Sequence, residues 1–435
     1  MRSSVATLRR REGAPRSAQD VQARERWVRR RVGITWGLLV LNVLTFYPGT
    51  WNGLPLAVPI PTTVGKAIAQ AAMPAALIMA LTVNRRMILR PNVFLCIVSL
   101  LVIGALMTML QAGTFGTVYR TFRLAGFVSA LWLLTPWWGR RDLLLVRYHL
   151  VSIFVILGSV LLGLLVAPGT ALSQGRLSGT LWPFPPTDVA HFAAIAAGLV
   201  IVLWLCGLVP GRAALLIVPA AAAMLLLTHT RTALFAMMAG VLVAGLSLVT
   251  AKARVRKLFA AAGVVISIGA ITLSGVVTSW LARGETANQL TGLTGRTDVW
   301  TAVVTVPRDT FQVIFGFGLS NLSFNGLPID SNWLGAYLDL GLLGVAVGAA
   351  MLLYMLGAAY FQPRGAQRAL ALFLVTYCLV SSFTETGLSG ASMYLLELTL
   401  AASLLVPSVA NGSRAVPSAA DTPLLAPSAA DKRPA

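Results

Sequence analysis

Arginines that interrupt apolar or turn-rich stretches are the residues of this chain with the clearest chemical potential. Arg120 and Arg123 lie three residues apart at the start of an apolar run, so a helix would place both on one face. Arg231 stands in THTRTAL between two apolar runs, and Arg176 lies in the turn-rich stretch RLSGTLWPFPP. A guanidinium group holds phosphate or carboxylate oxygens through paired hydrogen bonds. These side chains could therefore bind an anionic group at a membrane boundary, where an ionisable residue is a candidate functional residue by default.

The long polar interruption at residues 279–331 supplies a second group of candidates. Arg296 lies in GRTDVW within this segment, and Asp330 and Asn332 close it in IDSNW. The carboxylate of Asp330 can accept hydrogen bonds, and the amide of Asn332 can both donate and accept them. The segment also carries several large aromatic residues, enough apolar surface to fold back onto the protein, so we expect a working loop.

These candidates also have structural alternatives. The two arginines of the apolar run could extend along a helix end to the membrane interface. Thr297 or Asp298 could cap a short helix, and Asp330 or Ser331 could cap the apolar helix that follows. Capping and function do not exclude one another.

The composition requires that these residues be positioned by membrane helices. Hydrophobic residues make up 57% of the 435 residues and charged residues 11%, and the mean hydropathy is +0.79; a soluble domain has about 25% charged residues. Apolar runs long enough to cross a bilayer recur throughout. We expect an all-α polytopic membrane protein with twelve spans and one long extracytoplasmic loop between the ninth and tenth. The expected spans are residues 32–48, 64–83, 92–112, 121–138, 148–167, 188–207, 213–229, 232–250, 258–278, 332–356, 369–387 and 391–407.

The distribution of charge orients these spans. The formal net charge of +20 would suggest nucleic acid for a soluble protein, but here 26 of the 34 Lys and Arg fall on one side if the N-terminus is cytoplasmic. Both termini are then cytoplasmic, and the candidate arginines lie outside. Residues 1–31 form a basic cytoplasmic arm, and residues 408–435 form a low-complexity cytoplasmic tail; both are expected to be disordered. We expect the bilayer and no nucleic acid as partner.

Metal and disulfide chemistry find no support in the sequence. The cysteines at 96, 206 and 378 all fall within apolar spans, where a thiol behaves as a small hydrophobic group. The expected outer carboxylates are scattered without the paired spacing of metal ligands. We therefore expect no metal and no cofactor.

The order of the motifs resembles one family. RLSGT with a Pro-rich run, TRT between two spans, GRTDVW in a large outer loop, then GFG, DSNW and GLLG follow one another over about residues 170–390. This order and topology resemble the O-antigen ligase and Wzy-type polysaccharide polymerase family of bacterial envelope glycosyltransferases. The resemblance implies an inverting, metal-independent transfer of a glycan from a polyprenyl (undecaprenyl) diphosphate donor to an acceptor hydroxyl of a glycan, lipid or protein. It also implies the outer leaflet of the bacterial plasma membrane, in biosynthesis of exopolysaccharide or O-antigen-type polysaccharide.

The resemblance assigns roles to individual residues. By motif position, Arg231 and Arg296 correspond to the family's essential arginines, which would stabilise the charge of the departing diphosphate. Asp330 falls where many members carry a catalytic His, so this chain departs from the family at the base. His229 and His191 are rival candidates for that base. The three remaining arginines described above, together with Asn332 and His229, are expected to bind substrate.

A secondary transporter or flippase for a lipid-linked sugar is the alternative. Such transporters commonly show two similar halves and ionisable residues at mid-membrane. The sequence shows no half-to-half repeat, the long loop lies late in the chain, and the expected charges gather at the outer boundary. These features favour the glycosyltransferase.

Overall fold

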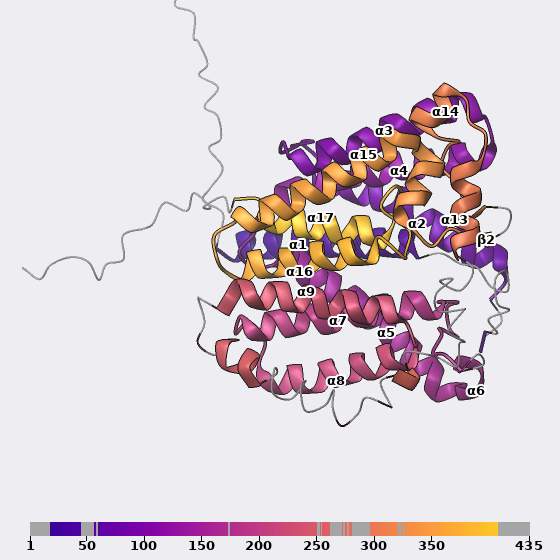
Figure 1. The fold of residues 1–435 in the computed structure, drawn as a ribbon. Coiled ribbons are helices and arrows are strands. Elements are labelled where there is room, and N and C mark those ends of the chain that lie inside the picture. The colour runs from indigo at the N-terminus through magenta and orange to yellow at the C-terminus, as the bar shows by residue number, and fades with distance from the viewer. Residues whose placement is uncertain are drawn as a thin grey trace, which may run out of the picture.

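The protein is an all-α helical bundle, known from a computed structural model (Figure 1). The structure describes residues 18–44, 56–57, 60–172, 175–249, 253, 255–261, 272, 275, 278–280, 296–320, 323–324 and 327–407. The bundle helices are α1 (Ala18–Val43), α2 (Thr62–Val83), α3 (Val93–Ala112), α4 (Phe115–Leu134), α5 (Leu144–Val166), α7 (Pro186–Leu205), α8 (Gly211–Leu227), α9 (Arg231–Val249), α15 (Asn332–Phe361), α16 (Ala366–Ser381) and α17 (Met393–Leu405). The shorter elements are η1 (Thr135–Trp137), α6 (Pro168–Ala171), α13 (Arg296–Thr305), α14 (Thr310–Phe315), β1 (Ser323–Phe324) and β2 (Leu327–Pro328), the two strands forming an antiparallel hairpin.

Within the described residues, six helices are long and apolar enough to cross a membrane: α2, α3, α5, α7, α9 and α15. Three shorter apolar helices, α8, α16 and α17, lie among them. Each expected span outside 258–278 coincides with a helix, whereas most of 258–278 lies outside the described residues. Several boundaries differ: α4 begins at Phe115 and α15 ends at Phe361, outside the expected spans, whereas α16 ends at Ser381, six residues before the expected end. The full count of twelve spans stays a prediction.

The N-terminal helix differs from the expected disordered arm. Helix α1 begins at Ala18. Within it, Arg29 Nη2 lies 2.9 Å from Oε1 of Glu25, one turn earlier in the helix. The same guanidinium lies 3.1 Å from Asp142 Oδ2, and Arg140 Nη2 lies 3.2 Å from Glu25 Oε1. Favourably ordered i,i+4 pairs stabilise a helix, and the contacts to the α4–α5 connector hold it in place. The expectation of disorder is therefore wrong for this part of the arm.

Helix α7 is the most buried of the six long apolar helices. Of its apolar window, 83% is buried, whereas the other five long apolar helices are 33–39% buried. It packs against α5, α8, α9 and α16 (Figure 1). Its small residues permit this close approach: a Cβ at Gly198 would overlap the ring of Phe373 on α16.

The helices bring two sets of connectors together at opposite ends of the bundle. At one, here called the arm end, the start of α1 contacts the α4–α5 connector, and Gly139 N donates to Ser403 O at the end of α17. At the other, here called the pocket end, Asn42 of α1 meets α2 and α4. Trp280, which follows the expected ninth span, donates to Leu226 O near the end of α8, also at the pocket end.

Helix α15 is broken at Gly341, whose backbone has φ 62° and ψ −153°. The carbonyls of Leu338 and Asp339 accept instead from Phe317 N and Gly318 N, both at 2.9 Å. A Cβ at Gly316 would lie 2.5 Å from the carbonyl of Asp339, so only glycine allows this approach. The GFG motif therefore docks into the break and satisfies backbone groups that the helix has released.

The described part of segment 279–331 folds onto this region, as its aromatic content predicts. Val299 and Val303 of α13 form a small buried cluster with Ile329 and Leu338. Helix α14 is capped by Asp309, whose carboxylate accepts from Gln312 N at 2.7 Å. The segment is therefore a folded cover on α15 where the structure describes it.

Arg308 fastens this cover to α15. Its Nη1 donates to Tyr337 O at 3.0 Å, and its Nη2 donates to Val303 O at 3.2 Å. The guanidinium carbon lies 4.1 Å from the ring centroid of Tyr337 and 4.8 Å from that of Phe317. Burial lowers the pKa of Arg308. Its hydrogen bonds and its contacts with the two aromatic rings hold the cover against α15, which is a structural role.

Candidate functional site

A pocket of about 420 Å³ at the pocket end is lined by six charged side chains. It is bounded by the starts of α4 and α7, the loop after GFG, the end of the hairpin, α15 and the α16–α17 connector. We call it the carboxylate pocket. Its charged lining residues are Arg120, Arg123, Asp188, Asp330, Asp339 and Glu385.

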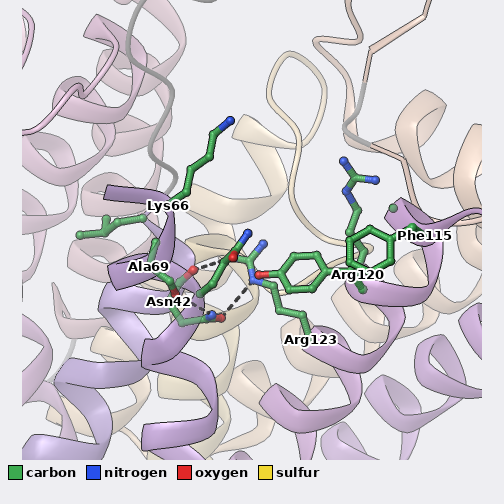
Figure 2. Close-up of a pocket in the computed structure, with 10 residues that line it drawn as sticks. Asn42, Lys66, Ala69, Phe115, Arg120 and Arg123 are labelled. Atoms are coloured by element: carbon green, nitrogen blue, oxygen red, sulfur yellow. Dashed lines mark hydrogen bonds between the residues drawn. The ribbon is translucent and has the colours of Figure 1, made fainter. Parts of the chain in front are cut away.

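A second pocket, of about 320 Å³, adjoins the first and shares Arg120 and Arg123 with it. It lies between α1, α2 and α4, and Lys66 adds a third cation (Figure 2). No Asp or Glu is among its lining residues in the described chain, so we call it the arginine pocket. The two pockets together offer cations on one side and carboxylates on the other, with two arginines at the junction.

Arg120 and Arg123 occupy the junction in different ways. Arg123 Nε donates to Asn42 Oδ1 at 3.2 Å, and Asn42 Nδ2 in turn donates to Ala69 O at 3.3 Å (Figure 2). Arg123 is thereby fixed to α1 and α2. Among the described residues, Arg120 has no hydrogen-bond partner, and Figure 2 shows its side chain extending from α4 apart from Asn42. The prediction that both side chains share one face is confirmed by their place in the same two pockets.

Asp330 lies in the carboxylate pocket immediately before α15. The N-cap position belongs to Ser331, whose side chain makes no capping hydrogen bond, so the expected capping role of Ser331 is wrong. Asn332 is buried; its Oδ1 accepts from Leu388 N at 2.7 Å, and its N–H donates to Ser382 O at 3.0 Å. Asn332 thus ties α15 to the α16–α17 connector and is not among the residues that line the pocket. Its binding to substrate stays a prediction.

His191 lines the carboxylate pocket with both ring nitrogens engaged. Its Nε2 lies 2.6 Å from Glu397 Oε1, and its Nδ1 lies 3.1 Å from the hydroxyl of Tyr377. Glu397 is fully buried on α17 and Tyr377 lies on α16, so these two contacts of His191 join three helices in the interior. A histidine in this position has no ring nitrogen left to accept a proton from a substrate, which weighs against His191 as the base.

The other candidate histidine, His229, and two arginines lie at the α8–α9 junction. Arg176 Nε donates to Thr228 O at 2.8 Å, and its Nη2 donates to Thr230 Oγ1 at 3.2 Å. His229 has a left-handed backbone with φ 52°, and its ring stacks on Trp280 at 5.7 Å. Arg231 is the first residue of α9. None of these side chains is among the residues that line the two pockets, so the structure separates the predicted site residues into two groups.

Arg296 is the first residue of α13, and its side chain lies outside what the structure describes. Thr297 and Asp298 lie inside the first turn rather than at the N-cap, so the expected cap at either residue is wrong. The role of Arg296 stays a prediction.

Three acidic residues near this site were missed as candidates. Asp339 lines the pocket beside the break of α15, and its Oδ1 accepts from Ser320 N at 3.1 Å. Glu385 lies in the α16–α17 connector, and Glu397 pairs with His191. Asp339 and Glu397 interrupt the apolar runs AYLDLG and YLLELTL, and that interruption was the available signal.

In comparisons with known proteins, no family model and no curated protein matches this chain. The resemblance to the O-antigen ligase and polymerase family therefore stays a prediction that rests on the motifs and their order.

Proposed function

We propose that this protein is a membrane glycosyltransferase that moves a glycan from a polyprenyl diphosphate onto an acceptor hydroxyl at the pocket end. The observation that carries the proposal is the shared wall of the two pockets. Arg120 and Arg123 lie between a cavity lined by cations and a cavity lined by carboxylates. A diphosphate leaving group and a hydroxyl that must lose a proton need these opposite environments side by side.

The reaction follows from that arrangement. The acceptor oxygen forms a bond to the anomeric carbon, and the bond from that carbon to the diphosphate oxygen breaks with inversion. The hydroxyl proton passes to a carboxylate, for which we propose Asp330. Asp330 lines the carboxylate pocket and stands at the motif position where many members of the family carry the catalytic His. Arg120 and Lys66 would hold the departing diphosphate, whose negative charge grows as the bond breaks.

Arg231 has a place in this proposal next to the pocket. The hydroxyl of its neighbour Thr232 forms a hydrogen bond with the hydroxyl of Thr384. Glu385, which follows Thr384 in the chain, lines the carboxylate pocket. The α8–α9 junction thus borders the same connector as the acceptor side. We propose that Arg231, with Arg176 beside the junction, binds the glycan or diphosphate of a substrate that extends beyond the pockets.

A transporter for a lipid-linked sugar is the second candidate, and the broken α15 favours it. Broken helices with ionisable residues beside the break are common at transporter binding sites. Asp339 stands two residues before Gly341, and the His191–Glu397 pair is buried. The two functions differ in outcome: a transferase makes a new glycosidic bond, whereas a transporter leaves the lipid-linked glycan intact.

The proposal is tested with purified protein in vesicles that contain the lipid-linked glycan of the source strain. Both extension of the glycan and its movement between leaflets are measured. Wild-type protein should form product, Asp330→Asn and Arg120→Gln should lower the rate by about 10²- to 10³-fold, and Arg212→Gln, exposed at the arm end, should match wild type. Movement between leaflets without product would identify the transporter. Equal activity of all variants would show that the pockets are not the site.

The proposal also requires an orientation. The pocket end must face the outside of the cell, as the distribution of Lys and Arg predicts. Reporter fusions at Gly175 should therefore be active outside and fusions at Gly365 inside. The opposite pattern would place the diphosphate site in the wrong compartment.

A further inference from the structure

A groove of about 630 Å³ lies on the side of the bundle, where α9, α15 and α16 meet. Helix α16 packs against both neighbours (Figure 1). Leu246 of α9 and Leu353 of α15 are apolar lining residues, 55% and 70% exposed, so the groove opens toward the membrane. A Cβ at Gly357 would meet no atom within 4 Å, which leaves this wall open. The volume falls within the range of about 300–1,000 Å³ typical of ligand sites.

Among the residues that the structure describes, Arg368 is the one charged residue that lines the groove. Its Nη1 donates to Gln362 O at 3.3 Å, and its guanidinium carbon lies 5.5 Å from the ring centroid of Tyr360. Its Nε is buried and has no hydrogen-bond partner among the described residues. A buried N–H of a charged group without an acceptor is costly, so this wall of the groove favours an anionic oxygen.

The position of Arg368 matches the headgroup layer of a bilayer. It lies in the first turn of α16, at the arm end, while the leucines of the groove lie further along the helices, where acyl chains run. Arg364, four residues earlier in the connector, is exposed and is not among the residues that line the groove. Basic pockets between membrane helices are a common form of recognition site for anionic lipid headgroups.

We propose that this groove binds one anionic phospholipid from the arm-side leaflet. The phosphate accepts from the guanidinium of Arg368, and an acyl chain lies along Leu246, Leu353 and Leu356. Charge complementarity selects an anionic lipid, because the described lining residues include a cation and no carboxylate. The site is separate from the two pockets, which lie at the other end of the bundle, and it does not depend on the proposed transfer reaction.

The test measures phospholipid that stays bound to the purified full-length protein. Wild type, Arg368→Gln and Arg364→Gln are washed in detergent, supplied with equal phosphatidylglycerol and phosphatidylcholine, and examined by native mass spectrometry. Wild type should retain phosphatidylglycerol in preference to phosphatidylcholine, and Arg368→Gln should lose about tenfold in affinity for it, the effect of one charged hydrogen bond. Arg364→Gln should retain it, because its side chain is not part of the groove.

Gly357→Leu provides a second variant that fills the groove and keeps the charge. It should also reduce retention of phosphatidylglycerol, while its thermal unfolding in detergent stays near that of wild type. Equal retention of the two lipids by wild type, or equal retention by wild type and Arg368→Gln, would overturn the proposal. Displacement of phosphatidylglycerol by a polyprenyl phosphate at equal concentration would also overturn it, since the groove would then prefer a different lipid.

Discussion

Thr232 and Thr384 share a hydrogen bond, with 2.8 Å between their hydroxyl oxygens. Thr232 follows Arg231 at the start of α9, and Thr384 precedes Glu385 in the connector that lines the carboxylate pocket. This contact joins the two groups of predicted site residues that the structure otherwise separates. It offers a direct test of whether both groups serve one reaction.

Thr232→Val and Thr384→Val should each lower the rate of glycan transfer by about 2- to 10-fold, the effect of one hydrogen bond. The double variant should be no slower than either single variant, because both substitutions remove the same contact. The rates are measured in the vesicle assay. Thr301→Val, on an exposed face of α13, is the control. If the double variant is slower by the product of the two single-variant decreases in transfer rate, the contact does not couple the two groups.

Arg231→Ala and Arg296→Ala should each abolish or greatly reduce transfer while the protein remains in the membrane at normal levels. Arg→Lys at either position should also fail if two parallel hydrogen bonds to phosphate are required, because lysine cannot form them. Surface polysaccharide in a deletion strain gives the readout.

A control for these variants should remove an arginine whose side chain does not hold the fold together. Arg308 is unsuitable, because its hydrogen bonds to Tyr337 and Val303 hold the cover on α15, and Arg308→Ala should cost about 1.5–3 kcal/mol in stability. Arg212→Gln at the arm end is suitable. Loss of transfer in that control as well would remove the case for a specific role of Arg231 and Arg296.

The sequence predicts the helices well and the site in part. Long apolar runs need no tertiary information to be identified, so the bounds of α2, α3 and α5 agree closely with the expected spans. Spacing also placed Arg120 and Arg123 together. The break at Gly341 was not predicted, because it depends on GFG docking against the helix from a segment some twenty residues earlier.

Buried partners were beyond sequence reasoning for the same physical reason. His191 and Glu397 are 206 residues apart and meet only because α7 and α17 pack in one bundle. The helical part of the arm is similar: Glu25 and Arg29 can stabilise a helix locally, but the contact of Arg29 with Asp142 fixes it. The spacing of residues in the sequence predicts which side chains are neighbours on one helix, but it does not predict contacts between distant helices.

The identity of the base is tested at Asp330. Asp330→Asn keeps the shape of the side chain but removes the proton acceptor, so the protein should insert normally and fail to transfer. Asp330→His should recover part of the activity, because imidazole can accept the proton. His229→Ala should remain active, since its ring stacks on Trp280 outside the pocket lining. Full activity of Asp330→Asn together with loss in His229→Ala would assign the base to His229.

The arm should respond to acid. Hydrogen bonds from Arg29 and Arg140 lower the pKa of Glu25, and the pKa of Asp142 is also lowered because Arg140 and Arg29 outweigh the effect of its burial. Stabilisation by these carboxylates is present above their ordinary pKa and is lost as the pH falls through the lowered values. Asp142→Asn should therefore reduce the melting temperature slightly at about pH 7, and this difference should shrink as the pH falls below the ordinary carboxyl pKa of about 4. A difference that persists in acid would show that charge pairing is not the cause.

The contact of GFG with the break of α15 should be the least tolerant point of the fold. A Cβ at Gly316 would lie 2.5 Å from Asp339 carbonyl atoms, and one at Gly341 would lie 2.6 Å from the carbonyl of Ile314. Both glycines also have positive φ, 80° and 62°. Gly316→Ala and Gly341→Ala should each lose about 3 kcal/mol or more, from overlap and backbone strain together.

Thermal unfolding of the purified protein in detergent measures this loss. Gly158→Ala is the matched control, because Gly158 lies within α5, where a Cβ meets no atom within 4 Å. Alanine there should raise stability by about 0.5–1 kcal/mol through its better helix propensity. If Gly316→Ala and Gly341→Ala unfold at the temperature of the control, GFG does not hold the break, and the neighbouring Asp339 is not fixed in the pocket wall by this contact.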